Sequence, residues 1–105
     1  MPQMNLALQL VPLVNQTQAY PLVDEAIALI ATSGLAYEVT PFNTVVEGDL
    51  QDLQALVAGL HGLMADRLDL GQEWLLNCQW HAAAGKALSF SAKTAGQPSF
   101  KPAAH

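Results

Sequence analysis

The chain opens on a two-residue alternation of apolar and polar side chains, which predicts a β-strand over residues 4–11. The apolar side of this strand consists of Met4, Leu6, Leu8 and Leu10. A second alternation over residues 72–82 predicts another strand, with an apolar side made of Trp74, Leu76, Cys78 and Trp80. Each strand therefore has one side suited to a hydrophobic core and a second side that is more polar.

Two helices are predicted between these strands. The first has Pro21 where a first helical turn tolerates proline, and Gly34 as a left-handed stop. Its apolar face consists of Val23, Ala26, Ile27 and Ile30. The second helix begins with Asp49 as its N-cap, and its apolar positions recur at helical spacing: Leu53, Leu56, Val57, Leu60, Leu63 and Met64.

Residues 37–47 are typical of two short strands joined by a Pro-Phe-Asn turn, because β-branched and aromatic residues flank turn formers. Polar side chains lie inside these strands, namely Glu38, Thr40, Thr44 and Glu47. The second of the two strands has two possible phases. Either Thr44 with Val46 or Val45 with Glu47 faces the helices, and each phase turns a polar residue inward.

The order strand, helix, strand, strand, helix, strand predicts an α+β fold of the ferredoxin-like kind, a βαββαβ sandwich. We expect a four-stranded antiparallel sheet with both helices on one face. The domain would cover residues 1–90. Residues 91–105 are rich in Ala, Gly, Ser, Lys and Pro, and are expected to form a flexible tail or one that is ordered by a partner.

The other face of this sheet would be lined by polar residues, namely Asn5, Gln9, Glu38, Thr40, Asn77, Gln79 and His81. An antiparallel sheet can leave such a face in water. Asn and Gln are poor strand formers, however, so their number also favours hydrogen bonding to a partner. The partner could be a ligand or the sheet of another copy.

Composition narrows the function classes. The hydrophobic fraction of 51% beside 12% charged residues is high for a small monomer, so part of the apolar surface is expected to be an interface between copies. A net charge of −5 argues against nucleic acid, which requires clustered Lys and Arg, and suits cationic or amine ligands.

The sequence lacks the residues needed for an intrachain disulfide or a metal site, and it lacks a segment that could span a membrane. The single cysteine, Cys78, cannot form an intrachain disulfide, and His61 and His81 have no companions at ligand spacing that would support a metal site. No apolar run reaches the length of a membrane span, and no secretory leader is recognised. We therefore expect a cytoplasmic protein without a cofactor, a metal or a membrane partner.

Four segments together resemble one family. They are residues 8–13 (LQLVPL), 20–27 (YPLVDEAI), 33–39 (SGLAYEV) and 44–50 (TVVEGDL), and they are similar to the small thiamine-binding proteins, long known as a domain of unknown function. The resemblance covers residues 5–82. It implies a ferredoxin-like fold, side-by-side dimers whose sheets join, often tetramers, and binding of thiamine or its hydroxymethylpyrimidine part without catalysis.

By this resemblance the ligand-binding residues would be Thr44 and Glu47, with Gln9 as their companion. Trp80, which otherwise suits the core, is the aromatic residue that we expect to contact the ligand. We expect the flat pyrimidine to enter a pocket between sheet and helices, where Thr44 and Gln9 hydrogen-bond the edge of its ring. Glu47 would offset the charge of an amine or thiazolium, and an aromatic ring would stack on the ligand.

Two other functions remain open at this point. The chain could be an oligomeric scaffold whose polar sheet face serves assembly alone. It could also be a small dimeric α+β enzyme, which shares this element order. No phosphate loop, metalloprotease helix motif or serine nucleophile elbow is present in the sequence, so we predict a protein that is not an enzyme.

Overall fold

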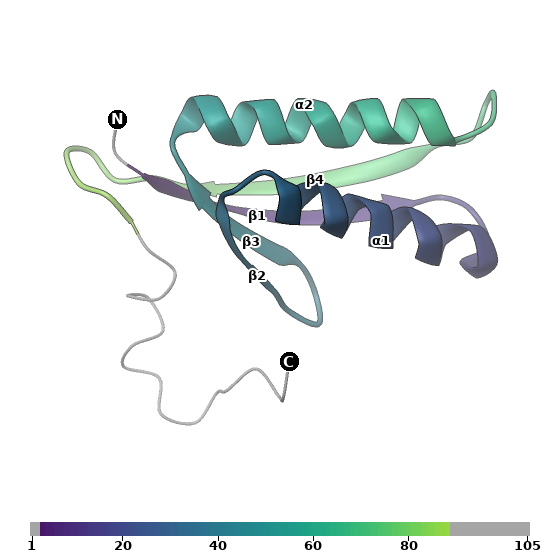
Figure 1. The fold of residues 1–105 in the computed structure, drawn as a ribbon, viewed down its shortest axis with the longest axis horizontal. Coiled ribbons are helices and arrows are strands. Elements are labelled where there is room, and N and C mark those ends of the chain that lie inside the picture. The colour runs from purple at the N-terminus through teal and green to yellow at the C-terminus, as the bar shows by residue number, and fades with distance from the viewer. Residues whose placement is uncertain (1–2, 89–105) are drawn as a thin grey trace.

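The computed structural model describes residues 3–88, and the predicted tail over residues 91–105 lies outside them (Figure 1). The elements follow the predicted βαββαβ order: β1 (Met4–Pro12), α1 (Gln16–Thr32), β2 (Ala36–Val39), β3 (Thr44–Gly48), α2 (Leu50–Arg67) and β4 (Trp74–His81). All six predicted elements are therefore present.

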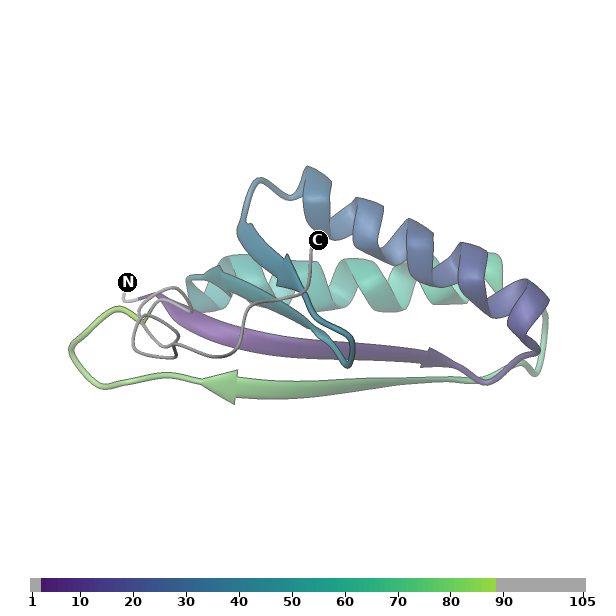
Figure 2. The same ribbon diagram turned by 90° about the horizontal axis from the view of Figure 1, so that it is seen from below.

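The four strands form one antiparallel sheet in the order β2-β3-β1-β4, so β1 is central and β4 is an edge strand. Both helices cover the same face of this sheet, as Figure 2 shows with the helices above the strands. This confirms the ferredoxin-like α+β architecture. Neither described helix covers its second face, and we call it the helix-free face.

The register of the strands settles which residues face the helices. Leu8 pairs with Thr44 and Leu6 with Val46, and directly paired residues lie on the same face of a sheet. Thr44 and Val46 are both buried, whereas Glu47 lies on the helix-free face opposite Asn5. Of the two phases that the sequence left open, the first is correct.

The hydrophobic core fills the space between this sheet and the two helices. Its buried members come from β1, β3 and both helices: Leu6, Leu8, Ala26, Ile30, Val46, Leu53, Leu56 and Leu60. Burial of one such leucine or valine side chain stabilises the fold by roughly 1.5–3 kcal/mol. The apolar stripes of β1 and of the two helices are thus faces that meet. The predicted apolar side of β4 is covered only in part, because Cys78 and Trp80 on it are exposed.

Helix α1 begins earlier than predicted. Asn15 is its N-cap, and the Asn15 side chain accepts a hydrogen bond from the backbone N–H of Gln18 at 2.9 Å. Pro21 therefore lies inside the helix and not in its first turn. Its missing N–H removes one backbone hydrogen bond, and its exposed position leaves the ring on the side away from the sheet.

The predicted helix boundaries elsewhere are confirmed. The Asp49 side chain accepts a hydrogen bond from the backbone N–H of Asp52 at 2.8 Å and so caps α2. Gly34 follows the C-cap of α1 with φ of 81°, a left-handed conformation that most other residues adopt only at a cost.

Polar contacts tie the helices to each other and to β4. Gln18 and Gln72 exchange two side-chain hydrogen bonds of 3.0 and 3.3 Å, which link the start of α1 to the loop before β4. The Nε1 group of Trp74 donates to Nδ1 of His61 at 3.0 Å. These contacts lie at the end of the sheet where β1 and β4 extend past the β2–β3 hairpin.

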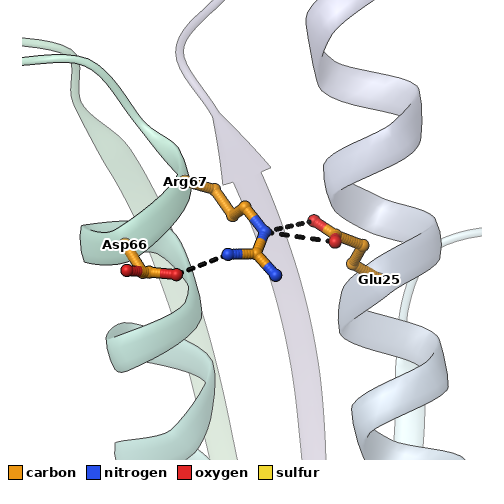
Figure 3. A network of polar contacts seen from close by, with 3 residues as sticks. All are labelled: Glu25, Asp66 and Arg67. Atoms are coloured by element: carbon orange, nitrogen blue, oxygen red, sulfur yellow. Dashed lines mark hydrogen bonds and ion pairs between the residues drawn. The ribbon is translucent and has the colours of Figure 1, made fainter.

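An ion-pair network crosses the outer side of the helical layer. Arg67 contacts both carboxylate oxygens of Glu25 at 3.2 Å and also the carboxylate of Asp66 (Figure 3). The hydrogen bond from Arg67 and the negative charge of Glu25 raise the pKa of the guanidinium group. All three side chains are exposed, so this network contributes little to stability.

Asn5 is an exception to the polar pattern of the helix-free face. Asn5 is only 3% exposed, and neither its Oδ1 nor its Nδ2 atom has a hydrogen-bond partner in the part of the chain that the structure describes. Its cross-strand neighbours are Glu47 on β3 and His81 on β4. An unsatisfied buried amide costs about 1–3 kcal/mol of stability.

We therefore predict that Asn5→Val stabilises the protein by about 1 kcal/mol, because it removes this unsatisfied amide and places a better strand former in β1. The free energy of unfolding measured in urea checks this. A loss of stability would show that the Asn5 amide is hydrogen-bonded in solution, by a second copy or by a ligand on the helix-free face.

Candidate ligand-binding site

A cavity of about 170 Å³ lies between α1 and the sheet, beside the end of the β2–β3 hairpin. We call it the helix-side cavity. Helix α1 provides one wall, made of Val23, Ala26, Ile27 and Ile30. These are the residues that the sequence assigned to the core face of this helix. This face therefore borders an opening as well as the hydrophobic core.

The cavity exists because β1 is longer than the pairing it makes with β3. That pairing ends at Leu8 opposite Thr44, whereas the pairing with β4 continues to Pro12. Beyond Leu8, no strand from residues 3–88 pairs with β1 on the β3 side. Backbone N–H and C=O groups of this stretch then face an opening where a ladder would otherwise continue.

The end of the hairpin closes the opening from the side. Residues 40–43 form a tight turn around the Thr40 hydroxyl, which accepts hydrogen bonds from the backbone N–H groups of Phe42 and Asn43 at 3.2 and 3.0 Å. The same oxygen lies 2.8 Å from Oδ1 of Asn43. This turn presents Phe42, which is 81% exposed, at the rim of the cavity.

The polar residues of the cavity are few and lie toward the hairpin end: Gln9, Thr40, Asn43 and Thr44. Two of their amide oxygens are already used, because Oδ1 of Asn43 contacts Thr40 and Oε1 of Gln9 accepts from Nδ2 of Asn77 at 3.2 Å. The Asn43 amide therefore offers an N–H donor to a ligand, and the Thr44 hydroxyl can donate or accept. The Gln9 side chain lies on the helix-free face beside Asn77 and borders this cavity only at its edge.

The dimensions of the cavity match a single ring. A cavity of about 150 Å³ in another protein holds one benzene molecule, so 170 Å³ admits a six-membered heterocycle. Aliphatic walls with a few polar groups at one end are typical of sites that bind flat, partly polar ligands. A ring-binding function requires free space between the sheet and the helices, and this region provides it.

The charged side chains of residues 3–88 do not line this cavity. None of the residues that line it is titratable, and Arg67 is held by Glu25 and Asp66 on the outer side of the helices. Within residues 3–88, no group of three His, Cys, Asp or Glu side chains is arranged to hold a metal ion. The cavity can therefore bind by shape and hydrogen bonding, without a local ion pair.

The structure brings together two of the four residues expected at the site. Thr44 and Gln9 both line the helix-side cavity. Glu47 and Trp80 do not: Glu47 lies on the opposite face of β3 from Thr44, and Trp80 pairs with Leu6 toward the other end of β1 and β4. Glu47 is three positions after Thr44, and in a strand an odd difference in position turns two side chains to opposite faces.

Sequence reasoning missed the contributions of Phe42 and Asn43. Their Pro-Phe-Asn segment was recognised as a turn, but a turn motif does not say which neighbouring surface it approaches. The usable signal was the Thr-x-x-Asn spacing, because Thr and Asn side chains commonly bond the backbone within one turn. That spacing predicts a rigid turn, and a rigid turn can carry an exposed aromatic residue.

Known proteins with similar sequences were found for part of the chain. Residues 6–69 match the family model described as thiamine-binding protein. The UPF0045 protein CPE1503 of Clostridium perfringens is 38% identical over 53 residues, which are 50% of this chain and 56% of that protein. The alignment thus spans little more than half the length of this relative.

Solved structures match over most of the chain. A protein of Thermotoga maritima, with a suggested role in thiamine biosynthesis or salvage, has a TM-score of 0.78 at 26% identity, covering 90% of this chain and 97% of its own. A domain of unknown function from Bacillus cereus, DUF77, has a TM-score of 0.76 at 26% identity, covering 88% and 86%. With its β1-to-α2 region matched by the family model and its fold shared with these structures, the chain belongs to the thiamine-binding protein family.

Proposed function

We propose that this protein binds thiamine, or the hydroxymethylpyrimidine part of thiamine, in the helix-side cavity and does not transform it. The observation that carries the proposal is a cavity of about 170 Å³, sized for one ring, with aliphatic walls and polar groups at one end. Membership of the family and the suggested role of the Thermotoga maritima protein support a thiamine-related role.

The pyrimidine ring suits the groups available. Its two faces would pack between the aliphatic side chains of α1 and those of the strands. Its ring nitrogens are acceptors, which complement the N–H donor of Asn43, and its amino group is a donor whose hydrogen bond the Thr44 hydroxyl can accept. The net charge of −5 also favours a cationic ligand at long range.

Binding without catalysis is part of the same proposal, and the lining formed by residues 3–88 supports it. General acid–base chemistry requires a titratable group within hydrogen-bond reach of the reacting atom, and no such side chain lines the helix-side cavity.

A cytoplasmic location is part of the proposal. Neither of the two described helices has the length and apolar character needed to cross a bilayer.

Self-association is a second part of the proposal, and a different observation favours it. β4 is an edge strand of eight residues, and Leu75 and Trp80 on it are 50% and 40% exposed. A long edge strand with exposed apolar side chains is a template for pairing with another chain. We propose that two copies join through β4 as a homodimer, from which a homotetramer can be built.

We predict that Thr44→Val weakens thiamine binding about threefold to tenfold, the effect of losing one hydrogen bond without a change of shape. Val23→Trp should abolish binding, because the indole would fill the space that the ligand ring needs. Isothermal titration calorimetry with thiamine and with hydroxymethylpyrimidine measures both effects. Gln54→Leu, an exposed change on α2 outside the cavity, serves as the control.

Circular dichroism and thermal unfolding establish that each variant is folded before it is titrated. If Val23→Trp is folded and binds as well as the unchanged protein, the ligand does not occupy the helix-side cavity. If the unchanged protein binds neither compound, the thiamine-related function itself is excluded.

Native mass spectrometry tests the proposed association. We expect the unchanged protein to have the mass of a dimer or tetramer of the 11.2 kDa chain. Leu75→Lys should have the mass of the single chain, because a charge on β4 opposes edge pairing. Leu70→Lys is a matched control, since Leu70 is fully exposed but lies before β4. Equal dissociation by both variants would show that the β4 edge is not the interface.

A further inference from the structure

A second cavity lies on the helix-free face, between β1, β4 and the end of the hairpin. Its volume is about 230 Å³. Four primary amides line it, namely Gln9, Asn43, Asn77 and Gln79. We call it the amide cavity. The remaining lining residues are Ala7, Leu8, Phe42 and Cys78, so no charged side chain is among them.

The amide cavity and the helix-side cavity share part of their walls. Leu8, Gln9, Phe42 and Asn43 line both of them. Both cavities lie where β1 extends past β3, so they approach the same gap from the two faces of the sheet. The two cavities therefore border one another at these four residues.

The position of the amides follows from the strand register. Gln9 pairs with Asn77, and Ala7 with Gln79, so the side chains of Asn77 and Gln79 lie beside Gln9 on the helix-free face. Ala7 is small and leaves the space in front of Gln79 open. Asn77 is held by its bond to Gln9, whereas Gln79 is an exposed residue of the edge strand.

We propose that the amide cavity is a second compartment of the ligand site and takes the uncharged, hydroxyl-bearing end of the molecule whose ring occupies the helix-side cavity. This inference rests on the proposed function. In thiamine that end is the hydroxyethyl group on the thiazolium ring. The chain would then recognise the two parts of one ligand from the two faces of its sheet, with the hairpin end between them.

The chemistry of the lining sets the class of this second group. A primary amide both donates and accepts hydrogen bonds, as a hydroxyl does, so amides can satisfy a hydroxyl in either direction. A phosphate ester would instead bring negative charge to a compartment that no cationic side chain of residues 3–88 lines. Phosphate is usually bound by Arg, Lys or a helix N-terminus.

The basic side chains of the described region lie elsewhere. Arg67 is engaged by Glu25 and Asp66 at the end of α2, and Lys86 follows β4. Neither lines the amide cavity. The site is therefore selective for the free alcohol over its phosphate ester, which makes unphosphorylated thiamine the ligand and thiamine monophosphate a poor one.

Gln79 gives the sharpest test, because its replacement does not break the bond between Asn77 and Gln9. Isothermal titration calorimetry would compare hydroxymethylpyrimidine, thiamine and thiamine monophosphate on the unchanged protein, Gln79→Leu and Gln79→Lys. Gln54→Leu is again the control for loss of an exposed amide. Thermal unfolding shows that each variant is folded.

We expect Gln79→Leu to weaken thiamine binding about threefold to tenfold and to leave hydroxymethylpyrimidine binding within about twofold. We expect Gln79→Lys to tighten thiamine monophosphate binding about tenfold, since a charge-assisted hydrogen bond replaces a neutral one. These two results together would establish the second compartment.

If Gln79→Leu affects neither compound, or both equally, the second compartment is wrong while the proposed function stands. Tight binding of thiamine monophosphate by the unchanged protein would overturn the selectivity for the free alcohol. If the unchanged protein binds none of the three compounds, the proposed function fails, and this inference fails with it.

Discussion

The unequal pairing of the central strand is the constraint on which the candidate site depends. β1 pairs with β4 as far as Pro12 but with β3 only as far as Leu8. A fully paired strand would leave its backbone groups satisfied and its neighbours in contact, with no space for a ligand. β3 begins only at Thr44, so it does not extend beside Gln9, and the sheet is open there. Both cavities lie at that opening.

The end of the β2–β3 hairpin gives this opening a fixed border. The Thr40 hydroxyl binds the backbone of its own turn, and this holds Asn43 and the exposed ring of Phe42 beside the cavities. Local side-chain-to-backbone bonds of this kind compete with regular strand pairing. The turn that ends the ladder and the turn that borders the site are therefore the same.

Much of the fold could be predicted from the sequence because its signals are local and agree with one another. The alternation in β1 and β4, the Asp49 cap and the left-handed Gly34 each specify one element, and all of them are confirmed. The start of α1 was misplaced because Pro21 suggested a first turn. The Asn15 cap and packing of α1 on the sheet outweigh the cost of a proline inside the helix.

The sequence by itself determined the element order, the core faces and the polar character of the candidate residues. Only the tertiary structure decided which of them meet. Thr44 and Glu47 are close along the chain yet lie on opposite faces of β3, whereas Gln9 and Asn77 are 68 residues apart and hydrogen-bonded. The alternation of apolar and polar residues predicts on which side of its own strand a side chain lies. Register between strands sets which side chains share a cavity, and it arises from pairing distant segments.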